Sequence, residues 1–91
     1  MTNTFRKEGS LTWSEVASGA AYSRVGLQIA ASGPVHVLIG TAAPAENAED
    51  YIVLSHGGTR EIDVSLETTD RVYARSPGGA SIMLRGFREA V

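Results

Sequence analysis

Short runs in which apolar and polar residues alternate one by one, with turn residues between the runs, dominate this 91-residue chain. The clearest run is Glu61–Leu66, which places Ile62, Val64 and Leu66 on one face. Alternation with a period of two is typical of a β-strand that has one buried face and one face toward solvent. The 3.6-residue period of an amphipathic helix is almost wholly missing. The sequence therefore predicts a protein built from strands.

The alternating pattern recurs along the chain and predicts about seven short strands. We expect them at residues 10–16, 25–30, 35–39, 51–54, 61–66, 71–75 and 80–85. Turn signals about every 8–12 residues are typical of an antiparallel sandwich or a small barrel. We therefore predict an all-β fold: an antiparallel, jelly-roll-like β-sandwich of about seven strands.

Three segments between these strands carry turn signals. The strands at 25–30 and 35–39 flank Ser32-Gly33-Pro34, so we expect these two strands to pair as a hairpin. Gly57-Gly58 and Gly78-Gly79 are also interpreted as hairpin turns with positive φ, because phosphate-binding loops open a helix and neither glycine pair precedes one. Thr41–Asp50 is expected to be a loop or a single helical turn. We predict one domain over residues 10–91, preceded at residues 1–9 by a flexible N-terminal arm that can order on binding a neighbour.

The composition excludes several classes of function. The chain has no cysteine, which excludes disulfides and thiol nucleophiles. Its eight Lys and Arg residues are scattered among ten acids for a net charge of −2, so we expect no nucleic-acid partner. No apolar run approaches the roughly 20 residues that cross a bilayer, and the N-terminus lacks the apolar segment of a signal peptide. We therefore expect no membrane partner and a cytosol-like setting.

The two histidines are the first candidates for chemistry. A metal site would need His36 and His56 to converge with a third ligand such as Asp50 or Asp63, and the spacing matches no zinc motif. Ser55, His56 and Asp63 can be written as a catalytic triad, but the chain has no nucleophile elbow. Two surface histidines are the favoured interpretation. We predict no enzyme activity, no metal and no cofactor.

Aromatic and charged side chains are the candidates for a contact surface. Tyr73 is expected to point away from Val72 and Ala74 into solvent, as tyrosines at protein interfaces do. Trp13 is expected to cap one end of the core. We predict that the interface residues are Tyr73, Arg75, Arg85, Arg71 and Trp13. The alternative is a sugar-stacking platform made by Trp13, Tyr22, Tyr51 and Tyr73.

A row of acids is predicted on the outer face of the strand at 61–66. Glu61, Asp63 and Glu67 would lie opposite the arginines at positions 71, 75 and 85. Ion pairs across neighbouring strands of one chain would account for this arrangement. Ion pairs between subunits are the alternative.

The order of motifs supplies a further expectation. The chain contains Arg24-Val25-Gly26-Leu27-Gln28-Ile29, then Ser32-Gly33-Pro34-Val35-His36-Val37-Leu38-Ile39-Gly40 and an alanine-rich loop. Further on it contains Val72-Tyr73-Ala74-Arg75-Ser76-Pro77-Gly78-Gly79-Ala80-Ser81-Ile82-Met83-Leu84. In this order, from Arg24 to Arg85, the chain resembles the small accessory virion proteins of tailed bacteriophages.

The resemblance implies a non-enzymatic virion structural protein, above all a capsid decoration or cement protein. Such a protein would be located in the virion after assembly in the host cytoplasm. It would form a homotrimer and bind the major capsid protein or another virion protein through many weak contacts that add up by avidity. The alternative is a tail- or fibre-associated module that binds carbohydrate at the host surface.

Overall fold

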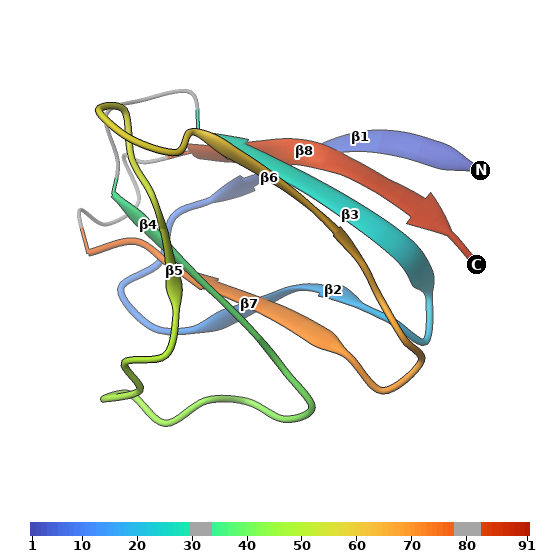
Figure 1. The fold of residues 1–91 in the computed structure, drawn as a ribbon, viewed down its shortest axis with the longest axis horizontal. Helices are drawn as coiled ribbons and strands as arrows, with labels where there is room; N and C mark the ends of the chain where they lie inside the picture. The colour runs from blue at the N-terminus through green and yellow to red at the C-terminus, as the bar shows by residue number, and fades with distance from the viewer. Residues whose placement is uncertain (30–33, 78–82) are drawn as a thin grey trace.

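The computed structural model describes residues 1–29, 34–77 and 83–91, and within them eight strands form two four-stranded antiparallel sheets packed face to face (Figure 1). The first sheet has the order β1 (Thr2–Glu8), β8 (Met83–Ala90), β3 (Tyr22–Ile29), β6 (Glu61–Ser65). The second sheet has the order β2 (Ser14–Ser18), β7 (Arg71–Arg75), β4 (Val35–Gly40), β5 (Ile52–Leu54). This is the strand order of a jelly roll. The predicted fold class is confirmed.

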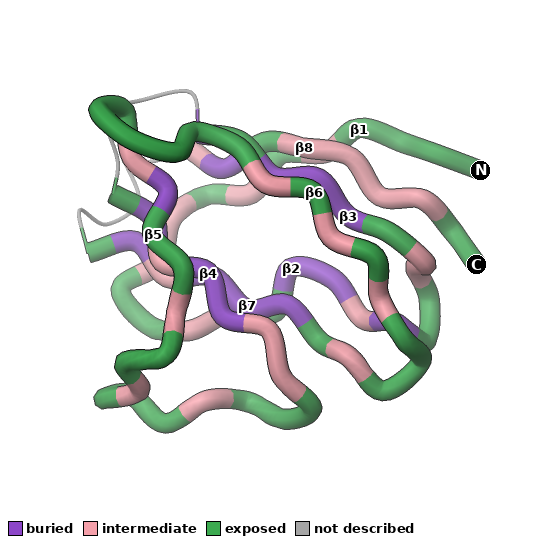
Figure 2. The backbone as a smooth tube through the Cα atoms, in the orientation of Figure 1, coloured by how far each residue is buried: buried purple, intermediate pink, exposed green. Residues whose placement is uncertain are grey.

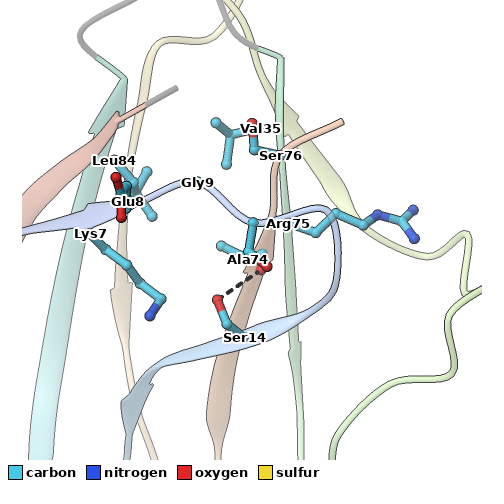
Figure 3. A pocket seen from close by; sticks show the side chains of 10 residues that line it. Lys7, Glu8, Gly9, Ser14, Val35, Ala74, Arg75, Ser76 and Leu84 are labelled. Atoms are coloured by element: carbon cyan, nitrogen blue, oxygen red, sulfur yellow. Dashed lines mark hydrogen bonds between the residues drawn. The ribbon is translucent and has the colours of Figure 1, made fainter. Parts of the chain in front are cut away.

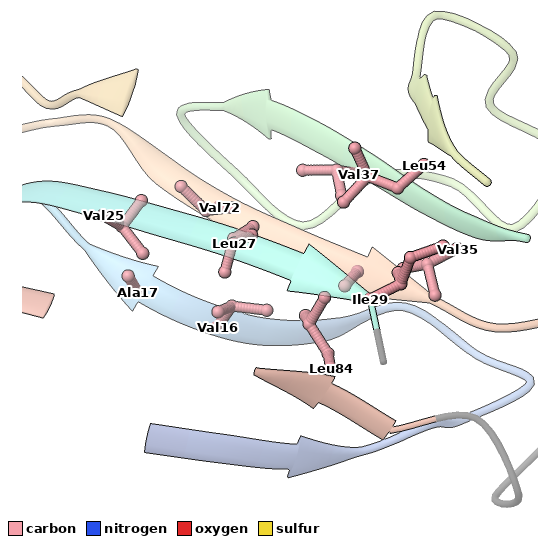
Figure 4. Packing of buried hydrophobic residues seen from close by; sticks show 11 residues of the cluster. Val16, Ala17, Val25, Leu27, Ile29, Val35, Val37, Leu54, Val72 and Leu84 are labelled. Carbon is pink, nitrogen blue, oxygen red and sulfur yellow. The ribbon is translucent and has the colours of Figure 1, made fainter. Parts of the chain in front are cut away.

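The core lies between the two sheets and consists of the alternate side chains of facing strands (Figure 4). Val25 and Leu27 of β3 meet Val37 of β4 and Val72 of β7, and all four are almost fully buried. Burying one such side chain stabilises a fold by about 1.5–3 kcal/mol. The inward positions predicted in 25–30, 35–39 and 61–66 are confirmed, because all of these side chains that the structure describes belong to the core or pack against it.

Burial is uneven between the strands (Figure 2). Buried residues run along β3, β4 and β7 and in the middle of β2, whereas β1, β5 and β6 are largely exposed or half-buried. These last three strands lie at the edges of their sheets. In the residues that the structure describes there is no helix, and so none that could span a membrane.

The predicted strand partners are largely wrong. Strands β3 and β4 lie in different sheets, so the expected hairpin between them does not form. Gly57-Gly58 lies in a turn closed by a hydrogen bond from Ser55 N to Thr59 O of 2.8 Å, but this turn connects β5 to β6 in the other sheet and neither glycine has a positive φ. The predicted turns at 32–34 and 76–79 fall largely outside the described residues. Among the eight described strands, β4 and β5 are the one pair that is both consecutive and hydrogen-bonded, and the 41–51 loop connects them.

The N-terminal segment also differs from the prediction. Thr2–Glu8 is no arm: it forms β1 and pairs with β8 along its whole length, from Thr2↔Glu89 to Glu8↔Met83. Phe5 anchors this strand by packing against the core. The next strand begins at Ser14 rather than at residue 10. The backbone N–H of Ala90 donates to the carbonyl oxygen of Met1 at 2.7 Å, so the two ends of the chain lie side by side.

Candidate functional site

An arginine and three rings gather on the outer face of the second sheet, and we call Trp13, His36, Tyr51 and Arg75 the Arg75 cluster. The guanidinium carbon of Arg75 lies 4.4 Å from the centroid of the Trp13 ring and 5.4 Å from that of Tyr51. Tyr51 stacks on His36 with centroids 4.0 Å apart. A guanidinium over an aromatic face is attracted by the negative centre of the ring. The cluster is therefore held together by contacts on several sides of Arg75.

The strands place this cluster by their register. His36 of β4 and Arg75 of β7 are direct cross-strand partners, and both point outward because Val37 and Ala74 point into the core. Arg75 Nε donates to His36 Nδ1 at 3.3 Å, and Arg75 Nη1 donates to the backbone carbonyl of Glu46 at 2.6 Å. Through these bonds Arg75 fixes the loop at 41–51 to the outer face of the sheet.

The environment of His36 keeps its imidazole neutral. Burial lowers the pKa of His36 below its usual value, and the positive charge of Arg75 lowers this pKa further. In the neutral ring Nδ1 accepts the hydrogen bond from Arg75, so the remaining proton is on Nε2. Protonation of Nδ1 would remove this hydrogen-bond acceptor and would put the positive charges of His36 and Arg75 in contact.

The outer face also contains Tyr73, but its predicted exposure is wrong. Tyr73 is only 7% exposed, as is Leu38, which lies directly opposite it. The alternation of side chains gives the correct face, but Leu38 lies opposite Tyr73 on that face, and the 41–51 loop is bonded to Arg75 two residues further along β7. Tyr73 is therefore part of a second, smaller buried layer.

The other predicted interface residues are divided between the two sheets. Trp13 does not cap the core but lies against Arg75 on the outer face of the second sheet. Arg71 is exposed on the same sheet, 3.5 Å from Glu15. Arg85 lies on β8, in the first sheet. The structure thus brings Trp13, Arg75, Arg71 and Tyr73 together on one sheet and separates Arg85 from them.

The four aromatic residues proposed as a sugar platform do not share one open surface. The rings of Trp13 and Tyr51 are 6.0 Å apart and tilted by 54°, with Arg75 against both. Tyr22 lies elsewhere, 5.4 Å from the guanidinium carbon of Arg88. Tyr73 is buried.

Arg88 is an inward-facing arginine that the sequence analysis did not single out. It lies opposite Val25 in β3, and its Nε and Nη2 both donate to the carbonyl oxygen of Val16 in the other sheet, at 3.1 and 2.7 Å. Its guanidinium carbon lies 3.9 Å from the ring centroid of Phe5. These contacts join the two sheets, so Arg88 is a structural residue.

The acids of β6 do not pair with arginines of β7, because the two strands lie in different sheets. Asp63 instead forms an ion pair with Arg24 on the neighbouring strand β3, and one of its bonds, from Arg24 Nε, is 2.7 Å long. The bond from Arg24 lowers the pKa of Asp63, and the same bond raises the pKa of Arg24. The predicted pairing of Asp63 with the arginines at 71, 75 and 85 is wrong.

A hollow of about 580 Å³ opens on the outer face of the first sheet, and we call it the Arg6–Arg85 hollow. Its walls are Thr4, Phe5, Arg6, Gln28, Arg85, Gly86 and Phe87. Arg6 and Arg85 are direct cross-strand partners, and Gln28 is the partner of Arg85 on the next strand. The sequence does not single out Arg6, because the pattern of residues 1–9 predicts a flexible arm and not a strand. The one signal in the sequence is Phe5, the single apolar residue between Thr2 and Glu8.

Two like charges directly opposite each other in a sheet are destabilising. In the part of the chain that the structure describes, the ion pairs are Arg24–Asp63 and Arg71–Glu15, and no carboxylate oxygen lies within 4.0 Å of a nitrogen of Arg6 or Arg85. The hollow thus presents two exposed guanidinium groups that no described acid neutralises by direct contact.

A much smaller cavity lies between β2, β7 and the end of β1 (Figure 3). Ser14 Oγ donates to the carbonyl oxygen of Ala74 at 3.5 Å beside it, and Ser76 is buried in its wall. Its volume of about 10 Å³ is close to the minimum that one water molecule needs. This cavity is too small for a substrate.

The residues considered for catalysis or metal binding each have different surroundings. His36 belongs to the Arg75 cluster, His56 is exposed in the turn after β5, and Asp63 is held by Arg24. Across residues 1–29, 34–77 and 83–91, no three His, Asp or Glu side chains are grouped so that they could hold a metal ion. Comparison of the chain with protein families, with curated proteins and with solved structures finds no match in any of the three.

Proposed function

We propose that the protein is a non-enzymatic structural protein that self-associates, as a homotrimer, and docks on a larger protein lattice. The order of sequence motifs between Arg24 and Arg85 favours one such protein, a capsid decoration protein of a virion. The jelly-roll fold is compatible with this role and with many others, so the proposal depends on the surface rather than on the fold.

The observation that carries the proposal is the exposed apolar edge of the second sheet. Strand β5 has three residues and, among the described strands, pairs with β4 alone, so no described strand bonds to the backbone N–H and C=O groups of its other side. Ile52 and Val53 are 45% and 44% exposed, whereas Leu54 is fully buried and anchors the strand. Exposed edges with apolar side chains are surfaces on which other chains pair or pack.

Covering this edge would remove apolar surface from water at each contact. Such a contact is small, and many copies bound to one lattice would add their affinities through avidity. A decoration protein works in this way, since its task is to bind many equivalent positions without performing chemistry.

The test is to place a charge on the edge. Natural proteins prevent edge association with lysine, so Ile52→Lys and Val53→Lys should turn the oligomer into a monomer in size-exclusion chromatography with light scattering. Val91→Lys is the matched control, because Val91 is an exposed apolar residue at the end of the chain, away from β5. Binding to purified capsids should fall with the edge variants and not with the control. A wild-type chain that remains a monomer at high concentration and ignores capsids would overturn the proposal.

A further inference from the structure

We infer that the Arg6–Arg85 hollow receives the acidic loop between β4 and β5 of a second copy of this chain. The inference rests on the proposed self-association and names the two surfaces that make it.

The receiving surface is basic and incompletely neutralised. Arg6 and Arg85 lie directly opposite each other, both exposed, with no carboxylate of the described residues within 4.0 Å. Gln28 adds amide hydrogen-bonding groups, and Phe87 adds an apolar wall. Arginine binds carboxylates through paired, charge-assisted hydrogen bonds. A carboxylate in the hollow would also relieve the repulsion between the two guanidinium groups.

The Phe87 wall is held in place by the strand beside it. The Phe87 ring lies over Gly26, the cross-strand partner of Phe87, and a Cβ on Gly26 would overlap this ring. The hollow is therefore shaped by β1, β3 and β8 together, with no loop of the described residues in its walls.

The complementary surface is the loop that precedes β5. Glu46, Glu49 and Asp50 are all exposed, within five consecutive positions. The loop is ordered by a turn in which Ala48 N–H donates to Ala45 O at 3.0 Å and by the bond from Arg75 to the Glu46 carbonyl. A loop that is already ordered loses little conformational freedom when it binds. The ordered backbone holds these three carboxylates at the surface, and none of them forms a salt bridge with another described residue.

The acidic loop also adjoins the exposed apolar edge. Asp50 is followed within three residues by Ile52 and Val53. A second copy that places its hollow on the loop would lie beside β5, so charged and apolar contacts would be continuous. The contact joins two different surfaces of the same chain, which makes it heterologous. Heterologous contacts close into rings when the rotation permits, as a trimer requires, whereas pairing of β5 with itself would give a two-fold dimer.

The experiment reverses the charges of each surface and then of both. The receiver variant is Arg6→Glu with Arg85→Glu, and the loop variant is Glu49→Arg with Asp50→Arg. Each should weaken self-association about tenfold or more, because like charges then meet across the contact. A chain with all four substitutions should regain wild-type association. Glu67→Arg is the control, since Glu67 is exposed in the loop between β6 and β7, does not line the hollow and does not belong to the 41–51 loop.

Each readout separates this inference from the proposed function. Wild-type self-association that both reversed variants retain would overturn the inference and leave the proposed function standing. Loss with the receiver variant alone, without rescue in the four-fold variant, would mean that the hollow binds some other anion and would overturn the choice of occupant. A wild-type monomer would overturn both. The neutral pair Arg6→Gln with Arg85→Gln replaces the receiver variant if that chain fails to fold, and we expect it to weaken association as well.

Discussion

The rings of His36 and Tyr51 stack with their centroids 4.0 Å apart and their planes 11° from parallel. His36 belongs to β4 and Tyr51 ends the loop that leads into β5, so the stack fastens this loop to the sheet. Arg75 donates to the same imidazole and to the Glu46 carbonyl. The protonation state of one ring is therefore coupled to the position of the acidic loop.

The stability of the fold should depend on the titration of His36. Its pKa in the folded protein lies below the usual 6.5, so the unfolded chain binds this proton first as the pH falls. The free energy of unfolding should therefore decrease as the pH falls below about 6.5 and level off below the folded pKa. Urea unfolding at several pH values between 7.5 and 5 measures this slope. His36→Gln should flatten it, and an unchanged slope in that variant contradicts the prediction.

Removing the guanidinium of Arg75 should destabilise the protein. Arg75→Ala deletes the contact with Trp13 and the bonds to His36 and Glu46, and we expect a loss of about 2 kcal/mol in the free energy of unfolding. Chemical denaturation followed by the fluorescence of Trp13, the only tryptophan, reports on the same site. Arg71→Ala on the same strand should cost no more than about 0.5 kcal/mol, because it breaks a single exposed ion pair. Equal losses in the free energy of unfolding of the two variants would show that the Arg75 cluster does not stabilise the fold.

Arg88 should resist conservative replacement. Both of its donors meet the Val16 carbonyl while its plane covers the Phe5 ring, and a lysine ammonium cannot do both. We expect Arg88→Lys to lower the free energy of unfolding by about 1–3 kcal/mol, measured by urea denaturation. Arg85→Lys, three residues earlier and facing outward, is the control and should have almost no effect. A stable Arg88→Lys chain would mean that charge alone suffices at this position.

Neutralising Arg85 should have opposite effects on folding and on association. Arg85→Gln removes the repulsion with Arg6, so the monomer should be unchanged or stabilised by up to about 1 kcal/mol in low salt. The difference should shrink as salt screens the two charges. Thermal unfolding of dilute protein at two salt concentrations measures this, and light scattering measures the expected loss of association. A clear destabilisation by Arg85→Gln would assign Arg85 a structural role instead.

The faces of the strands could be predicted from the sequence, because alternation is a local property. Ile62 and Val64 point inward as expected, and so do Val25 and Leu27. Strand partners are a non-local property. In a jelly roll the chain passes between the sheets after almost every strand, so neighbours in sequence, such as β3 and β4, are not neighbours in a sheet. Proximity along the chain therefore favoured a hairpin that does not exist.

The candidate site depended on the same missing information. Arg85 was recognised as a surface arginine, but its partner Arg6 belongs to a strand at the other end of the chain. Alternation gives Tyr73 the correct face but not its burial, because its neighbour Leu38 on β4 and the bond from Arg75 to the 41–51 loop are non-local contacts. The Arg6–Arg85 hollow and the Arg75 cluster both depend on the register of strand pairing and on the placement of a loop. The pattern of the sequence contains neither.

The position of β8 between β1 and β3 has a consequence for how the molecule is made. Strand β1 pairs with β8 along its whole length, although six other described strands lie between them in the sequence. A pairing of this kind closes a very long loop, and the entropy cost of closing it must be met before the contacts form. The first sheet should therefore be completed slowly, after strands that lie closer together in the sequence have packed.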